Sequence, residues 1–129
     1  MAKIAIYSDD ANVRNTLVNA LGSSLGSGLP VETMQFATAA ALRQYVDKGG
    51  QVDLFVLDGE AVPEGGLGVA RQLKDEVFNV APIIVLIARP ADRWLAAWSR
   101  AEASLQHPVD PFNLATTATQ LLNQKLATA

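Results

Sequence analysis

One segment constrains the fold of this 129-residue chain more than any other: the apolar run from Val52 to Leu57 that ends in Asp58. Five of the six residues from Val52 to Leu57 are large and apolar, and polar side chains do not alternate with them. This pattern is typical of a parallel strand that helices cover on both faces. Asp58 would then stand at the carboxyl end of the strand, where open α/β sheets bind ligands and carry their chemistry.

A second apolar run, residues 3–7, ends in the same way, because Ser8, Asp9 and Asp10 follow it directly. If two neighbouring parallel strands bring carboxylates to one edge, those acids form a pocket that can hold a hard cation. One carboxylate in such a pocket can also accept a phosphoryl group. We therefore expect Asp9 and Asp58 to lie side by side. The alternative is structural, since acids that precede a helix stabilise its first turn.

Composition narrows the class of protein. Half of the residues are hydrophobic, which is enough to build the core of one domain of this length. The net charge of −3 argues against a nucleic-acid partner. The chain has no cysteine, so disulfides and thiolate metal sites are excluded. No apolar run is long enough to span a membrane, and we expect a cytoplasmic protein without membrane contact.

Strands and helices alternate five times along the chain. The expected strands are residues 3–7, 31–36, 52–58, 83–87 and 104–106, and the expected helices are 11–25, 39–48, 67–78, 91–102 and 111–126. Thr38 is expected to cap the second helix, and Pro111 to be the first residue of the last one. This alternation predicts an α/β fold with a doubly wound parallel sheet of five strands and helices on both faces.

These residues together resemble the receiver domains of two-component response regulators, the CheY-like proteins. The resemblance covers essentially the whole chain. It rests on the acids after the first strand, on Asp58, on Pro82 before the fourth strand and on His107-Pro108 before the last helix. It implies a flavodoxin-like sheet with strand order 2-1-3-4-5. Among receivers, the chain looks closest to stand-alone actinobacterial ones, so we expect residues 1–129 to be a single receiver-like signalling domain, not an enzyme, without an output domain.

The resemblance implies a role for each pocket residue. Asp58 aligns with the phosphoacceptor and Asp9 with the acid that binds magnesium directly. Glu60 takes the position that usually offers a backbone carbonyl to the metal, so Asp9, Asp58 and Glu60 are the expected metal ligands. Ser8 replaces the second acid, and Asp10 could lean into the pocket as its substitute. Because one carboxylate is lost, Mg²⁺ binding is expected to be weak.

The residues that bind and relay the phosphoryl group in receivers are also replaced. Ile87, followed by Ala88, stands in place of the Thr or Ser and cannot donate a hydrogen bond. His107 stands in place of the lysine, and a neutral imidazole is shorter and replaces that cation only in part. Ser104 stands in place of the aromatic switch residue. The prediction is an atypical receiver with weak or no phosphorylation of Asp58.

The His107-Pro108 step is expected to be a cis peptide, since receivers usually turn this corner in cis. Proline makes that isomer accessible at about 0.5–1 kcal/mol. Both residues are predicted to belong to the pocket. His107 is the only histidine of the chain, so we expect it at the rim of the pocket and not as a metal ligand.

Trp94 and Trp98 are four residues apart on the predicted helix 91–102 and therefore share one face. They could pack against neighbouring helices, or they could form a surface for a partner, since tryptophan is enriched in interface hot spots. In receivers, partners or a second receiver usually dock on the fourth helix, fifth strand and fifth helix. The resemblance thus implies an interface with Trp94, Trp98 and Ser104, for a sensor histidine kinase, another signalling protein or a second copy.

A function of another class stays open on the same fold: a small flavodoxin-like ligand binder or an Mg²⁺-dependent phosphoryl-transfer enzyme. Flavodoxins need a phosphate-binding loop after the first strand, and residues 8–12 carry two acids that would repel phosphate. The order Asp58-Gly59-Glu60 departs from the Asp-x-Asp of aspartate-nucleophile phosphatases. Neither a dinucleotide-binding nor a P-loop motif occurs. These departures favour the signalling module.

Overall fold

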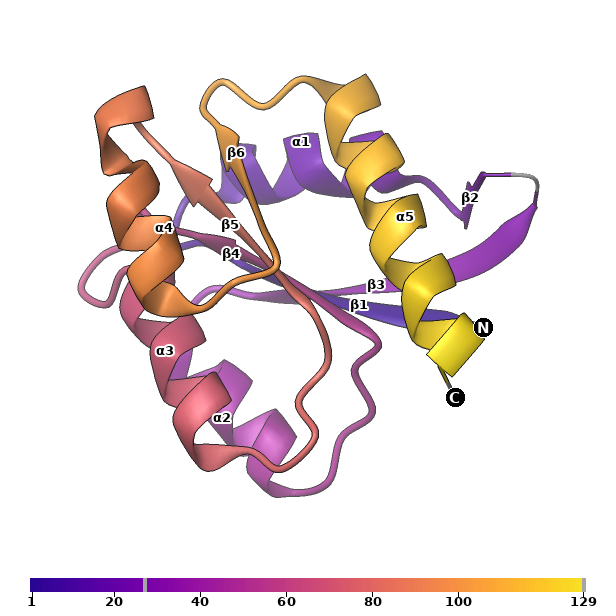
Figure 1. The fold of residues 1–129 in the computed structure, drawn as a ribbon, viewed down its shortest axis with the longest axis horizontal. Helices are drawn as coiled ribbons and strands as arrows, with labels where there is room; N and C mark the ends of the chain where they lie inside the picture. The colour runs from indigo at the N-terminus through magenta and orange to yellow at the C-terminus, as the bar shows by residue number, and fades with distance from the viewer. Residues whose placement is uncertain (27, 129) are drawn as a thin grey trace.

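The computed structural model of the chain describes residues 1–26 and 28–128, with side chains up to residue 124, and has a central sheet between two layers of helices (Figure 1). The strands are β1 Ala2–Tyr7, β2 Ser24–Leu25, β3 Leu29–Phe36, β4 Leu54–Asp58, β5 Ile83–Ile87 and β6 Ala103–Gln106. The helices are α1 Ala11–Leu21, α2 Ala39–Asp47, α3 Gly66–Glu76, α4 Arg93–Ser99 and α5 Pro111–Thr128, and a 3₁₀ turn, Pro90–Asp92, precedes α4.

The order of the strands is β2-β3-β1-β4-β5-β6. The five longer strands are all parallel, and their order is the predicted one. The two-residue strand β2 adds a sixth strand at one edge, where it pairs antiparallel with β3. This strand was not predicted, because its residues lie in the segment 11–25 that was expected to be one helix.

Two predicted helices are too long. Helix α1 ends at Leu21 because Gly22 takes a left-handed φ of 62° and its N–H bonds back to the carbonyl of Val18. Helix α4 starts only after the 3₁₀ turn and ends where Arg100 takes a φ of 65°. The other elements agree with the predicted bounds to within two residues. Thr38 caps α2 by accepting a hydrogen bond from the N–H of Ala41, and Pro111 begins α5, as predicted.

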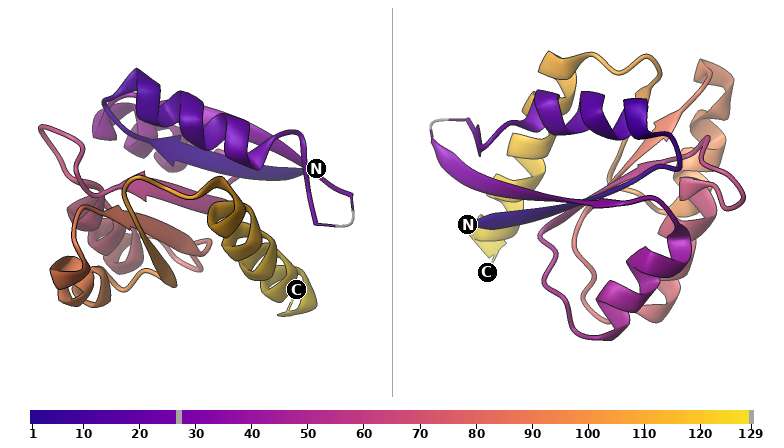
Figure 2. Two further views of the ribbon diagram at one scale, coloured as in Figure 1. Left: turned by 90° about the horizontal axis from the view of Figure 1, so that it is seen from above. Right: turned by 180° about the vertical axis from the view of Figure 1, so that it is seen from behind.

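The sheet is covered on both faces. Helices α1 and α5 lie on one face, and α2, α3 and α4 lie on the other (Figures 1 and 2). Every residue of β4 and β5 is buried, and alternate side chains enter the two separate cores. Phe55 and Leu57 face α2, α3 and α4, whereas Leu54 and Val56 face α1 and α5. The unbroken apolar run of β4 follows from this double burial, which stabilises the fold by about 1.5–3 kcal/mol for each such side chain.

Candidate functional site

The carboxyl ends of the parallel strands meet at one edge of the sheet. Three of these strands bring a polar residue to that edge. The register pairs Tyr7 of β1 with Leu57 of β4, so the next residues, Ser8 and Asp58, are neighbours. His107 directly follows β6, and its N–H donates to the carbonyl of Ile87 at the end of β5. The side chains of this edge come together because all these strands point the same way.

Asp58 is buried, with 2% of its surface exposed, and both of its carboxylate oxygens have partners. Oδ2 accepts a hydrogen bond from Oγ of Ser8 at 2.8 Å. Oδ1 accepts one from the N–H of Glu60 at 2.9 Å and lies 2.9 Å from Nε2 of His107. A carboxylate without such partners would be costly to bury. These three contacts therefore hold the acid in place.

Ser8 is fully buried and joins the aspartate to the first helix. Its hydroxyl donates to Asp58 and accepts from the N–H of Asp10 at 3.1 Å. Its carbonyl accepts from the guanidinium of Arg14 at 2.7 Å. Where receivers have a second acid, this chain has a neutral donor whose hydrogen is already given to Asp58.

His107 lies at the rim of the site, with 23% of its side chain exposed. The bond between His107 and Pro108 is cis, as predicted, and a second cis bond joins Val62 and Pro63 in the loop between β4 and α3. The ring nitrogen is close enough to Asp58 to donate to it as neutral imidazole or to pair with it as imidazolium. His107 thus contacts the same carboxylate that the lysine of a receiver contacts.

The two exposed acids after β1 have different partners. Oδ1 of Asp9 accepts a weak hydrogen bond from the N–H of Val62 at 3.2 Å, which ties it to the loop after β4. Oδ1 of Asp10 caps α1 by accepting from the N–H of Asn12 at 2.8 Å. The capping role considered for this pair therefore applies to Asp10.

An open cavity of about 390 Å³ lies over Asp58. Its lining comprises Asp9, Asp10, Val13, Asp58, Glu60, Ala88 and His107. Three residues predicted for the pocket lie outside this lining. Ser8 is buried beneath it, and Pro108 lines a neighbouring hollow of about 190 Å³ beside α1. Ile87 lies on the same face as Val85, which α2, α3 and α4 cover, so its side chain belongs to the core.

The predicted magnesium ligands, Asp9, Asp58 and Glu60, all line this cavity. In the described part of the chain, no group of three or more His, Cys, Asp or Glu side chains is placed to hold a metal ion by itself. Mg²⁺ in proteins commonly uses one or two carboxylates and keeps several waters. The donor set therefore fits a hydrated ion, with the accessible carboxylates of Asp9 and Glu60 beside the buried Asp58.

Tyr7 lies in the core beside the site, and its role was not predicted from the sequence. Its buried hydroxyl donates to the carbonyl of Glu64 in the loop between β4 and α3, and the carboxylate of Glu64 pairs with Arg43 of α2. Burial, followed by the charges of Glu64 and Asp9, raises the pKa of Tyr7 above its usual 10.0. The hydrogen bond from Arg43 lowers the pKa of Glu64 below 4.5. The sequence did offer a signal: Tyr7 ends a strand that was expected to be buried, and a buried tyrosine hydroxyl needs a hydrogen-bond partner.

The two tryptophans of α4 are on the surface: Trp94 is 67% exposed and Trp98 is 48% exposed. Ala96 and Ser99 provide the buried side of this helix. The guanidinium of Arg71 in α3 lies 5.5 Å from the centre of the Trp98 ring and donates to the Trp98 carbonyl at 2.9 Å. Trp98 therefore contacts α3. Ser104 is half-buried in β6 and pairs with Val85.

A parallel sheet of this order, with a buried aspartate at the end of its central strand and acids after its first, defines a CheY-like receiver domain. Solved receivers have the same fold. The receiver domain of the Francisella response regulator 1452 superimposes with a TM-score of 0.82, at 16% identity over 97% of this chain and 99% of that one. A CheY-like receiver domain protein of Methanospirillum hungatei gives a TM-score of 0.78, at 18% identity over 100% and 99% of the two chains.

The sequence itself gives a closer relationship, although no protein-family profile matches it. The chain is 49% identical over 121 residues to an uncharacterized response regulatory protein of Mycobacterium tuberculosis, which covers 93% of this chain and 90% of the relative. The same match occurs in a second strain. The chain therefore belongs to the response regulators and is a receiver domain of two-component signalling. Such domains are in general signalling modules that interact with histidine kinases or other signalling proteins. Within residues 1–26 and 28–128, no helix has both the length and the apolar character needed to cross a membrane.

Proposed function

We propose that this chain is an atypical receiver, in which Asp58 is phosphorylated weakly or not at all and which acts through protein contacts in the cytoplasm. The observation that carries the proposal is the hydrogen bonding of Asp58. Its oxygens are engaged by Ser8, by the N–H of Glu60 and by His107. These contacts occupy three of the about four lone-pair sites of the carboxylate, and hydrogen bonds to a carboxylate draw electron density from the oxygen that would attack phosphorus, which weakens the nucleophile.

The charge balance around Asp58 supports the same conclusion. Receivers use a fixed cation to pair with the phosphoryl group, whereas a histidine such as His107 carries a charge only when it is protonated. Ser8 removes one of the acids that attract Mg²⁺. We propose that Mg²⁺ is held weakly through Asp9, Asp58 and Glu60, with water as its other ligands.

The route from the site to the surface also lacks its usual groups. Ile87 is buried in the core and has no hydroxyl to turn toward a phosphoryl group. Ala88 lines the cavity but offers no side-chain donor. Ser104 is too small to act as the aromatic switch. Recognition by this receiver is therefore mostly constitutive.

The partner surface that we propose contains Trp94, Trp98 and Ser104. Both indole rings are exposed, and large rigid rings are effective anchors because they lose little conformational entropy on binding. A sensor histidine kinase or another signalling protein is the proposed partner. The same face of α4, β6 and α5 could also join two copies.

A titration with beryllofluoride and Mg²⁺, followed by NMR, tests the proposal. We expect small shifts that stay near Asp58 and Glu60 and that Asp58→Asn abolishes. The indole signals of Trp94 and Trp98 and the amide of Ser104 should not move. Shifts at Ser104 and Trp98 as large as those at the cavity would contradict constitutive recognition.

A further inference from the structure

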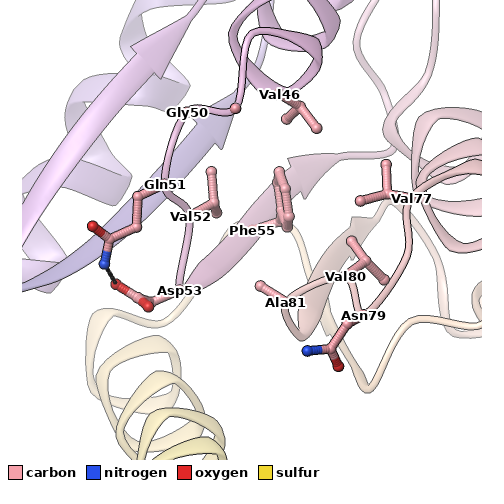
Figure 3. A pocket seen from close by; sticks show the side chains of 11 residues that line it. Val46, Gly50, Gln51, Val52, Asp53, Phe55, Val77, Asn79, Val80 and Ala81 are labelled. Atoms are coloured by element: carbon pink, nitrogen blue, oxygen red, sulfur yellow. Dashed lines mark hydrogen bonds between the residues drawn. The ribbon is translucent and has the colours of Figure 1, made fainter.

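Another hollow lies at the amino-terminal end of β4 and β5, opposite Asp58. It has a volume of about 290 Å³ and lies between the two loops that lead into these strands. Six apolar side chains line it: Val46, Val52, Phe55, Val77, Val80 and Ala81. Figure 3 shows them converging on one space from the end of α2, from the start of β4 and the loop before it, and from the segment after α3. Nothing in the receiver chemistry described above uses this hollow.

The walls of the hollow are already held in place. A Cβ atom on Gly50 would lie 2.4 Å from the ring of Tyr45, so a larger residue here would displace that ring. The hydroxyl of Tyr45 donates to the carbonyl of Gln51 at 3.0 Å, and Nε2 of Gln51 lies 3.3 Å from Oδ2 of Asp53 (Figure 3). Asp53 is in turn tied to β1, since it accepts from the N–H of Lys3 at 2.8 Å. A preformed hollow of this kind binds without a large ordering penalty.

Phe78 stands beside the hollow and is 97% exposed. Its neighbours Val77 and Asn79 both line the hollow, and Asn79 takes a left-handed φ of 54° in the turn that presents the ring. A single exposed aromatic ring needs no explanation by itself. Here, however, an apolar ring and an apolar hollow share one edge of the molecule.

We propose that two copies of this chain pair through this edge, each placing Phe78 in the hollow of the other. A two-fold interface requires each copy to present both halves of the contact on the same surface. Phe78 and the hollow meet this requirement, whereas a ring and a hollow on opposite surfaces would produce a filament. Asp53 is the one ionisable residue in the described lining, and its carboxylate already accepts hydrogen bonds from Lys3 and Gln51. Beside the inserted ring, the Asp53 carboxylate therefore keeps hydrogen-bond donors of its own chain.

The proposed contact is small. Two phenylalanine rings bury about 150–250 Å² each, which is well below the about 1,200 Å² of a stable interface. The dimer is therefore weak and its population depends on concentration. Because the hollow lies at the opposite end of the strands from Asp58, association is independent of phosphorylation and does not rest on the function proposed above.

Sedimentation velocity on the full chain, from about 10 μM to about 1 mM, measures the association. We expect a monomer–dimer equilibrium whose Kd rises at least about tenfold in Phe78→Ala. Phe112→Ala is the matched control, because Phe112 is also exposed (76%) but lies at the start of α5. It should leave the Kd unchanged, as should Asp58→Asn.

Mixed samples of ¹³C-labelled and unlabelled protein identify the contact directly. Nuclear Overhauser effects between the Phe78 ring of one copy and the methyl groups of Val46 and Val80 of the other would support the proposal. A monomer at the highest concentration would overturn it, and so would a dimer that Phe78→Ala leaves intact or that only Trp94→Ala disrupts. Loss of binding to another protein in Phe78→Ala, with wild type monomeric throughout, would assign the edge to that protein and equally overturn it.

Discussion

The surroundings of Asp58 and the route from Asp58 to the α4 surface are built from different kinds of groups. Around the carboxylate, Ser8, the N–H of Glu60 and His107 all engage its oxygens. Along the route, Ile87 and Ala88 have no side-chain hydrogen bond to offer. The fold can therefore keep a buried carboxylate at the sheet edge even though the residues between it and the α4 surface have no side chain that could respond to its phosphorylation.

The two regions also stabilise the fold in different ways, the first through hydrogen bonds and the second through apolar burial. Hydrogen bonds to a charged group contribute about 1.5–3 kcal/mol each, so the contacts of Asp58 are structural as well as chemical. Residues such as Ile87 stabilise the fold by apolar burial, which does not depend on the state of the aspartate. The predictions below test this separation, from the largest expected effect to the smallest.

Replacing the exposed tryptophans should have the largest effect, and it should appear in binding. Trp94→Ala or Trp98→Ala is expected to weaken partner binding by about 2 kcal/mol or more if these rings are the anchors. Isothermal titration calorimetry with the cognate partner measures the change, and circular dichroism confirms that the variants are folded. Equal affinities for the folded variants and wild type would move the interface to another surface.

Removing the buried hydroxyl at Ser8 should destabilise the fold. Ser8→Ala leaves Oδ2 of Asp58 buried without its donor, at a cost of about 1.5–3 kcal/mol. Urea unfolding gives the free energy of each variant. Ser104→Ala serves as the control, because Ser104 belongs to the route toward the α4 surface and not to the surroundings of Asp58. It should change stability by less than about 0.5 kcal/mol. Similar losses at both positions would remove the distinction between the two regions.

Tyr7→Phe should have a smaller effect, about 0.5–1.5 kcal/mol, because it removes one neutral hydrogen bond to the carbonyl of Glu64. It should also change the alkaline pH dependence. The pKa of Tyr7 is raised on folding, so its stabilising contribution is complete below pH 10.0 and is lost as the pH rises through the raised value. Wild type should lose more stability than Tyr7→Phe in that range. Parallel curves would show that the hydroxyl is not held as described.

Glu64→Gln should have the smallest effect, since half of the Glu64 side chain is exposed and salt screens its pair with Arg43. The pKa of Glu64 is lowered on folding, so its contribution is present above pH 4.5 and is lost as the pH falls through the lowered value. Thermal unfolding at low and high salt measures it. A difference between wild type and variant that persists in high salt would show that this pair is less screened than its exposure indicates.

The sequence predicted those parts of the fold that depend on local pattern. The buried strands that end in Asp58 and Ile87 were recognisable because apolar runs bounded by Gly and Pro have few other interpretations. The end of α1 was not, because Leu25 continues the helical spacing beyond Gly22. Strand β2 depends on pairing with β3, which local periodicity does not encode.

Part of the candidate site could likewise be predicted from the sequence, and part could not. Asp9, Asp58 and His107 could be placed together because they follow parallel strands, and the ends of such strands meet. The bond from Tyr7 to Glu64 joins residues 57 positions apart, and the conformation of a loop decides it. The position of Trp98 against Arg71 likewise depends on how α4 rests on α3, which the helical spacing of the tryptophans leaves undetermined.

Intact-mass measurement after incubation with acetyl phosphate and Mg²⁺ tests the central claim most directly. Wild type should gain little or no phosphoryl mass, and Asp58→Asn none. The double variant His107→Lys with Ile87→Thr should gain clearly more than wild type, because it restores the fixed cation beside Asp58 and the hydroxyl that receivers carry at the end of this strand. Extensive Mg²⁺-dependent labelling of wild type that Asp58→Asn abolishes would contradict the account.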